Sequence, residues 1–320
     1  DTAERVAAKL GCPVAAGTRY TVNVTPRKPD GDIATFDWLQ KQSQGVKRLG
    51  VLRMDVDDLG DLFRWGMTGN ATLSRVAALN LALTLFFEGW VGQLCRRVNA
   101  GDRGDLVYAI YSGGDDLFIV GAWDVLPGLA HAIHEDLGRF AAGHPDVHLS
   151  GGLTLHAGKY PLYQAAADAD QALDAAKDLE RAGKDTGHPH NKDAFHFLDV
   201  TLPWETYPAI VAEQKALCEL TRDREAGGAG VPRALLQTLL TLYEHYRHHL
   251  KDDKLHWGPW MWRGAYNLTR LAEQRNLPPA VQAQIETLRD DLKQENYRHI
   301  EIVGPAARWA ELLTRKERKL

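Results

Sequence analysis

The chain has 320 residues, of which 44% are hydrophobic and 25% charged, and it carries a net charge of −4 with a pI near 6.4. These averages are typical of a globular protein with two modest domains, and they exclude a basic footprint spread over the whole protein. Three widely separated cysteines predict neither a disulfide framework nor a zinc finger, so we expect a cytoplasmic protein. The longest apolar run, residues 76–87, is too short to span a membrane, and we expect no membrane partner.

The first 46 residues carry the weakest pattern and are interpreted as an N-terminal linker segment without chemistry. Residues 1–10 resemble a short helix, residues 20–24 alternate like a strand, and residues 26–32 form a loop rich in turn residues. The chain begins at Asp1, which suggests a fragment or a processed form.

A first acidic cluster follows an apolar strand. Residues 49–54 read L-G-V-L-R-M and continue directly into Asp55, Val56, Asp57 and Asp58. Acidic strand ends often only solvate a loop, so this cluster alone does not identify a site.

A second acidic cluster occupies a predicted hairpin. Residues 106–110 and 117–120 are typical of strands, and the intervening Y-S-G-G-D-D run contains the Gly-Gly pair of an ordinary turn. The adjacent carboxylates of Asp115 and Asp116 distinguish it from a plain turn. Two such charges about 4 Å apart repel by roughly 4 kcal/mol at an effective dielectric of 20 unless a cation relieves them. Magnesium binds one or two carboxylates and keeps its other positions for water and phosphates, so the two clusters together predict a nucleotide site.

The order of the elements predicts an α+β fold with a ferredoxin-like, split βαβ topology. Further elements are expected after the first strand: helices at 72–98, 125–142 and 161–181, and strands at 147–156 and 194–198. In this topology both acidic clusters lie at the same edge of the sheet on neighbouring central strands.

The remainder of the chain, residues 201–320, is predicted to be an all-α helical domain, with helices at 204–218, 233–250, 260–273, 279–295 and 305–315. Its tryptophans could stack on bases, but helical spacing favours a place in the core. The histidines of the loop at 184–192 and of the helix near 245–249 are interpreted as solvated residues, since neither set has metal-ligand spacing.

Residues 49–60, L-G-V-L-R-M-D-V-D-D-L-G, together with Y-S-G-G-D-D closely resemble the second palm domain of the large Cas subunit of type III CRISPR effector complexes. That family is related to the GGDEF nucleotidyl cyclases. S-G-G-L-T at 150–154, K-Y-P at 159–161, and Ala169, Asp170 and Lys177 extend the similarity. R-W-A-E-L-L-T-R-K at 308–316 favours the Csm-type, III-A form. The resemblance makes residues 47–200 a palm, or nucleotidyl cyclase-like, domain.

The resemblance implies a cyclic oligoadenylate synthase that polymerises and cyclises ATP with Mg²⁺ or Mn²⁺ when an antiviral complex binds target RNA. By this similarity Asp55, Asp115 and Asp116 are the catalytic and metal-binding acids. The implied nucleotide-binding set is larger: Ser112 as a donor to base or ribose, Gly113 and Gly114 for close backbone approach, Val56 through its carbonyl, Asp57 beside the metal, and Lys177 and Lys192 as phosphate contacts.

The similarity also implies partners: the other type III subunits, guide RNA and target RNA, and the HD nuclease and first palm domains that normally precede this region. The sequence contains no His-Asp dipeptide and no second strand-plus-acid unit, so we expect no DNA cleavage and weak or no synthesis by this chain alone. The loop at 183–191 is longer than the family pattern, which leaves the phosphate-binding lysine open between Lys184 and Lys192.

Two alternatives accompany this interpretation. A GGDEF-type diguanylate cyclase using GTP would usually have Glu and Phe where this chain has Asp116 and Leu117, and would lack the helical tail. A non-catalytic scaffold subunit of an RNA–protein complex would be expected to lose one of the acids, because unpaired carboxylates at a closed site cost stability.

Overall fold

The computed structural model describes residues 24–64, 72–179, 192–221, 233–251, 254–256, 258–274 and 277–315, together with Lys9 and Val22. The expected helix at 1–10, most of the expected strand at 20–24, and Lys184 therefore lie outside the described residues. Of the expected first strand, Val24 forms a single bridge to Ala109.

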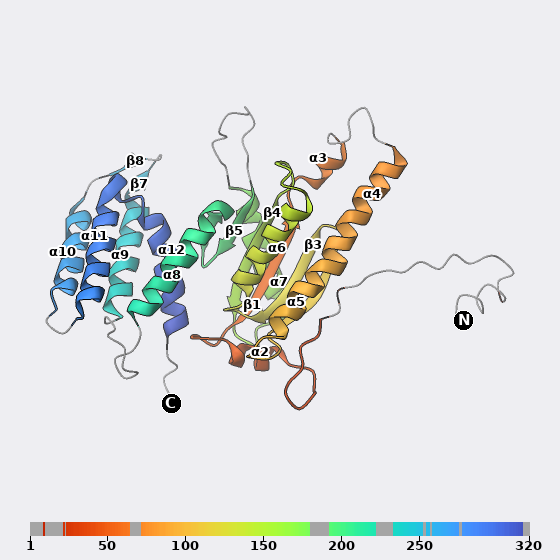
Figure 1. The fold of residues 1–320 in the computed structure, drawn as a ribbon, viewed down its shortest axis with the longest axis horizontal. Helices are drawn as coiled ribbons and strands as arrows, with labels where there is room; N and C mark the ends of the chain where they lie inside the picture. The colour runs from red at the N-terminus through yellow and green to blue at the C-terminus, as the bar shows by residue number, and fades with distance from the viewer. Residues whose placement is uncertain are drawn as a thin grey trace.

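A six-stranded sheet forms one half of the molecule (Figure 1). Its strands run in the spatial order β2-β3-β1-β4-β5-β6, and all neighbours are antiparallel except β4 and β5. The strands are β1 (Leu49–Val56), β2 (Val107–Gly113), β3 (Asp116–Ala122), β4 (Leu149–His156), β5 (Ala194–Phe197) and β6 (Val200–Pro203). The first four have the order of a ferredoxin-like sheet, which confirms the fold predicted from the element order.

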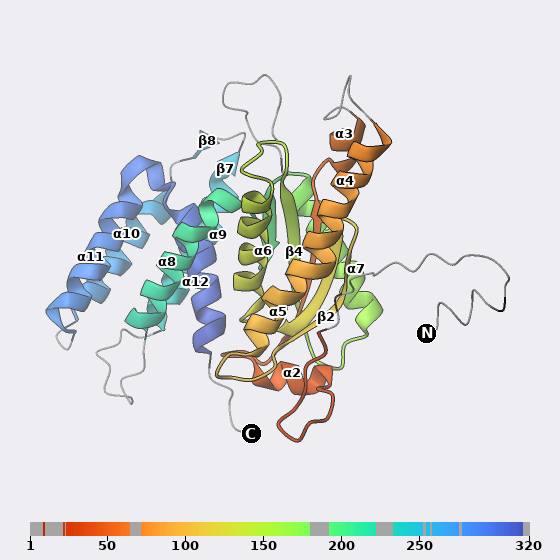
Figure 2. The same cartoon turned by 45° about the vertical axis from the view of Figure 1, so that its right-hand side comes forward.

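The alternating side chains of β1 explain why helices cover both faces of this sheet. Leu52, Met54 and Val56 are buried against α4 (Leu73–Thr84), α5 (Val91–Asn99) and α6 (Leu126–Phe140) in the larger core. Leu49 and Val51 are buried in a second core with residues of α2 (Phe36–Gln42) and α7 (Leu162–Lys177). Figure 2 shows α4, α5 and α6 together on one side of the sheet.

The helix predicted at 72–98 is present, with Thr72 as its N-cap accepting from the Arg75 amide. Its middle, Leu85–Trp90, is a π-helical segment (η1) that the sequence pattern did not predict. A short helix, α3 (Leu59–Arg64), precedes it. The continuous helical run Leu73–Asn99 has the length and apolarity of a membrane span, but 44% of its most apolar stretch is buried inside the protein, as in a core helix.

Helices dominate the chain after β6: η2 (Trp204–Thr206), α8 (Tyr207–Leu220), α9 (Ala234–His249), α10 (Pro259–Ala272), α11 (Pro279–Lys293), η4 (Gln294–Tyr297) and α12 (Ile300–Thr314). This confirms the predicted helical region, and two details differ from the expectation. A small antiparallel pair, β7 (Leu250–Lys251) and β8 (Lys254–Leu255), follows α9. The last helix also begins at Ile300 rather than at Pro305, because the fully buried Ile300 and Val303 pack into the core and the helix continues through the proline.

Aromatic side chains join the helical part to the sheet. Phe195 of β5 stacks on Trp204 with ring centroids 4.8 Å apart, and Phe197 meets Trp309 of α12 edge-on at 5.3 Å. Trp260 is also buried, as expected of a core residue, whereas Trp262 is 60% exposed; Trp257 lies outside the described residues. The sheet and the helices therefore share one continuous hydrophobic core.

Candidate nucleotide site at the edge of the sheet

The two acidic clusters meet where β1 ends and β3 begins. Asp55 is directly opposite Asp116 in the antiparallel register of these strands. The amide of Val56 donates to the carbonyl oxygen of Asp115 across 3.1 Å. The chain segments that carry the three predicted catalytic acids are therefore hydrogen-bonded neighbours, which confirms the adjacency expected from the split βαβ topology.

The hairpin turn depends on its two glycines for different reasons. Gly113 pairs with Asp116, so Gly114 and Asp115 form a two-residue loop. Gly114 has φ +69°, as the first position of a type II′ turn requires, and a Cβ there would meet no atom within 4 Å. A Cβ on Gly113 would lie 3.2 Å from Oε1 of Glu88. Open space above Gly114 is compatible with the predicted backbone approach to a nucleotide, whereas Gly113 accommodates Glu88.

Electrostatics at this edge favour a cation. The pKa of Asp115 is raised, first by burial and then by the negative charges of Asp55 and Asp116. Within the described ranges no three acidic, histidine or cysteine side chains are grouped as a ready metal cage. Magnesium needs only one or two carboxylates when water and phosphates fill its remaining positions. The oxygen donors of the two strand ends therefore fit a magnesium or manganese ion shared with a nucleotide.

Two cationic side chains, one from α7 and one from β1 itself, already contact the acids. Lys177, the last residue of α7, forms an ion pair with Oδ2 of Asp55. Arg53 lies two residues before Asp55 and so faces the same side of β1, where its guanidinium reaches Asp116 at 3.7 Å and Asp170 of α7 at 3.0 Å. The predicted nucleotide-binding Lys177 is thus at the site, bound to a carboxylate.

Asp57 takes a structural place in the fold instead of the expected contact with metal or nucleotide. Its side chain is 2% exposed, and Oδ2 accepts from Oγ of Ser150 at 2.9 Å and from the amide of Asp193 at 3.0 Å. Burial raises the pKa of this carboxyl group. Its bonds link the ends of β1, β4 and β5.

Ser112 is likewise used inside the protein. Its side chain is buried, and its hydroxyl donates to the carbonyl oxygen of Phe87 at 2.7 Å. A serine hydroxyl has one hydrogen to donate, so the expected donation to base or ribose is not available in this arrangement. The bond fixes β2 against the π-helical segment.

The second predicted lysine lies near the site but contacts a different acid. Nζ of Lys192 is 2.5 Å from Oδ1 of Asp58, an exposed residue just after the Asp55 strand. The amide of Lys192 donates to the carbonyl of Leu179 at 3.0 Å, which ties the start of β5 to the end of α7. Its role as a phosphate contact remains a prediction.

Arg53 and Glu88 were not predicted. A signal for Arg53 exists, since an i, i+2 spacing places it on the Asp55 face of a strand. No comparable signal identifies Glu88, because its approach to Gly113 depends on the π-helical segment that carries it.

Residues 48–186 match the model of the Cas10/Cmr2 second palm domain. A protein of Mycobacterium tuberculosis, named CRISPR system single-strand-specific deoxyribonuclease Cas10/Csm1 (subtype III-A), is 33% identical over 243 residues, covering 72% of this chain and 27% of the relative. The protein of the same name from Methanocaldococcus jannaschii is 32% identical over 183 residues, covering 54% and 23%. The chain thus spans about a quarter of the length of these relatives.

Solved structures share the fold. Csm1 of T. onnurineus superposes with a TM-score of 0.64 at 23% identity, covering 95% of this chain and 42% of that one. A Csm1–Csm4 cassette in complex with cA3 gives a TM-score of 0.65 at 22% identity, covering 95% and 40%. Other structures of the cassette contain AMPPNP or one ATP.

Proposed function

We propose that this chain, which belongs to the Cas10 family of type III-A CRISPR systems and carries its second palm domain, contributes the nucleotidyl-transfer half of a cyclic oligoadenylate synthase. The enzyme would join ATP molecules through 3′–5′ bonds and close the product into a ring. Binding of target RNA by the assembled complex would switch this reaction on.

The observation that carries the proposal is the direct pairing of Asp55 with Asp116, with Asp115 in the adjoining turn. This arrangement presents carboxylates from two different strand ends on one edge of the sheet. Burial, and then the negative charges of Asp55 and Asp116, raise the pKa of Asp115, and this concentration of carboxylates favours a divalent cation. A surface turn without chemistry has no need for that concentration of charge.

The residues that would hold Mg²⁺ or Mn²⁺ are Asp55, Asp115 and Asp116. When bound, the ion stabilises negative charge on the triphosphate during attack of a 3′-hydroxyl and departure of pyrophosphate. Lys177 supplies a further positive charge beside Asp55. Arg53 of β1 forms ion pairs with Asp116 of β3 and with Asp170 of α7, and so holds both side chains in place. We further propose that the Val56 carbonyl adds a ligand and that Lys177 and Lys192 contact phosphates.

Adenine nucleotides are the proposed substrates. Related Csm1–Csm4 cassettes have been solved with ATP, AMPPNP, linear pppApA and cyclic cA3 and cA4. Those ligands belong to the related proteins and motivate the choice of ATP over GTP for this chain.

The proposed partners follow the same relatives. Csm4 accompanies Csm1 in the solved cassettes, so a Csm4-type subunit is the first partner we propose. Guide RNA, target RNA, and the HD and first palm domains complete the proposed assembly, in the cytoplasm. We propose domain boundaries after residues 46 and 200; the sheet itself ends with β6 at Pro203.

The test is synthesis by the assembled effector complex, incubated with labelled ATP, GTP, magnesium and target RNA. Wild type should make cyclic adenylate, and the Asp115→Ala, Asp116→Ala double variant should make none. Equal product from both, or a cyclic dinucleotide from GTP, would refute the proposal. Complete assembly of the variant complex, checked by size and subunit content, separates loss of chemistry from loss of structure.

A further inference from the structure

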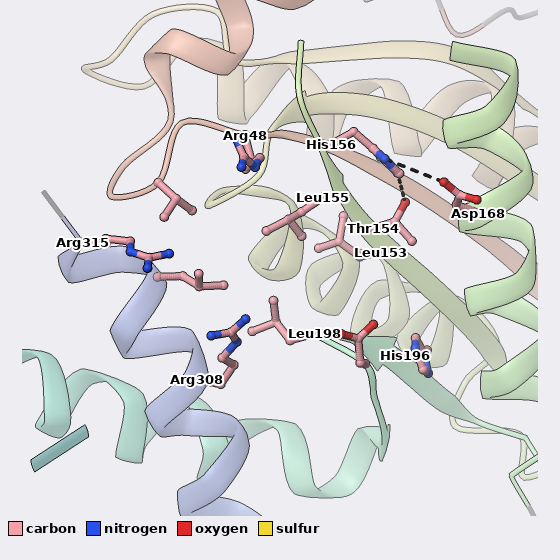
Figure 3. A pocket seen from close by; sticks show the side chains of 13 residues that line it. Arg48, Leu153, Thr154, Leu155, His156, Asp168, His196, Leu198, Arg308 and Arg315 are labelled. Carbon is pink, nitrogen blue, oxygen red and sulfur yellow. Dashed lines mark hydrogen bonds and ion pairs between the residues drawn. The ribbon is translucent and has the colours of Figure 1, made fainter. Parts of the chain in front are cut away.

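A cavity of about 440 Å³ lies between the β4–β5 part of the sheet and α12 (Figure 3). It lies at the opposite end of the sheet from the acids. His156 at this cavity pairs with Leu49 at the start of β1, whereas Asp55 at the other end of β1 pairs with Ser150. Six residues of strand separate the two ends, which is about 20 Å. The cavity is therefore distinct from the candidate nucleotide site.

Three arginines surround one end of this cavity. Arg48 comes from the segment before β1, Arg308 from α12, and Arg315 from the residue after it; Figure 3 shows their guanidinium groups turned toward the same space. All three side chains are exposed, so a ligand can reach them. Convergence of three permanent positive charges from two distant segments is unfavourable unless an anion compensates it.

The protein supplies little of that compensation. Arg308 and Arg315 share the single carboxylate of Glu311, at 3.0 Å and 3.6 Å. Arg48 donates to the carbonyl oxygen of Lys47 at 3.2 Å, and no carboxylate of the described residues is within ion-pair distance of it. Asp168 and Asp199 also line the cavity. Asp168 pairs with His156 at 3.8 Å, and neither acid is within ion-pair distance of a described arginine of this cluster. Glu311 is therefore the one described carboxylate that contacts the three guanidinium groups.

The rest of the cavity has a different character. Leu153, Leu155 and Leu198 form an apolar wall. Beyond it, His156 contacts Oγ1 of Thr154 at 2.8 Å, and His196 contacts Oγ1 of Thr201 at 2.9 Å, so both imidazoles are held in fixed orientations. A ligand that fills this space would have an anionic group, an apolar or aromatic face, and polar edges.

We propose that this cavity binds a nucleoside phosphate, either free or as one unit of an RNA strand, with its phosphate on Arg48, Arg308 and Arg315. One guanidinium group can donate two parallel hydrogen bonds to phosphate oxygens. A phosphate therefore satisfies three guanidinium groups better than a single carboxylate does. In this arrangement the base packs against the three leucines, and His156 and His196 can hydrogen-bond to the polar edge of the base. This binding goes beyond the proposed synthesis and uses none of its residues.

The test is calorimetric titration of the chain with AMP, adenosine and a 5′-phosphorylated RNA tetramer, in buffer with a chelator so that metal-dependent binding at the acids is absent. We expect saturable binding of AMP or the tetramer, and weakening by about tenfold in Arg48→Ala and Arg308→Ala, since each loses charged hydrogen bonds. Arg139→Ala removes an exposed charge elsewhere and should bind as wild type does. Asp55→Ala should also bind normally, which distinguishes this site from the proposed synthase site.

Arg48→Ala is the decisive variant because Arg48 makes no ion pair with a described residue, so its loss should leave thermal unfolding unchanged. Similar affinity for AMP and the tetramer assigns the site to free nucleotides, and much tighter binding of the tetramer assigns it to an RNA strand. Absence of saturable binding, adenosine binding as tightly as AMP, or equal loss in Arg139→Ala would overturn the proposal.

Discussion

At the residue scale, removal of Lys177 should change magnesium binding and Mg·ATP binding in opposite directions. Its ammonium lies beside Asp55, where a divalent cation would also lie. Lys177→Ala should therefore bind magnesium about three- to tenfold more tightly in the absence of nucleotide, because a competing charge is gone. It should bind Mg·ATP more weakly, because a phosphate contact is lost.

Lys192→Ala is the matched control, since Lys192 pairs with Asp58 and not with a proposed metal ligand. Its magnesium affinity should remain near that of wild type. Calorimetry with magnesium alone and with Mg·ATP measures both effects. Weaker magnesium binding by Lys177→Ala in the absence of nucleotide would contradict this role.

The residue scale also shows where prediction from sequence ends. Asp55, Asp115 and Asp116 could be brought together because strand order and register determine their proximity. The inward bonds of Asp57 and Ser112 could not be foreseen. Periodicity gives the face of an element on which a side chain lies, but its partner depends on what the remaining chain packs there.

At the element scale, the β2–β3 hairpin depends on a backbone conformation that glycine alone adopts readily. Gly114→Ala should lower the free energy of unfolding by about 1 to 2 kcal/mol through its positive φ, since the added Cβ meets no neighbour. Gly128 in α6 is also open to a Cβ but has ordinary helical φ, so Gly128→Ala should stabilise by up to about 1 kcal/mol. Urea unfolding of both variants measures the contrast, and equal effects of the same sign would refute it.

Most elements followed from the sequence, and the exceptions have physical causes. The ferredoxin-like order and the helices of the second half rest on hydrophobic period and on signals for the start of a helix. The π-helical segment has no such signal, because its residues read as a continuation of an α-helix. The early start of α12 depends on burial of Ile300, which outweighs the usual preference of proline for the first helical turn.

At the scale of the whole molecule, His131 of α6 joins the sheet domain to the helical part by stacking on Tyr207, with ring centroids 4.6 Å apart. Burial lowers the pKa of His131 below its ordinary value. The neutral imidazole therefore contributes stability above pH 6.5, and this contribution is lost as the pH falls below about 6.5, where the unfolded chain takes up the proton more readily.

We expect the melting temperature to fall between pH 7.5 and pH 5.5, and to fall less in His131→Phe, which keeps the ring and removes the titration. His144→Phe is the control, because His144 is 53% exposed and lies outside this contact. Differential scanning calorimetry at both pH values measures the difference. An identical pH-dependent fall in wild type and His131→Phe would exclude this role for His131.

The central claim is that two strand ends form one nucleotide site, and a double-mutant cycle of Mg·ATP binding tests it most directly. Asp55→Ala and Asp115→Ala should each weaken binding by about tenfold or more, and the double variant should be little weaker than either, because both carboxylates serve one bound ion. Asp146→Ala, which removes an exposed carboxylate elsewhere, should bind as wild type does. Additive losses, or unchanged binding by Asp55→Ala, would show that the paired acids do not share a site.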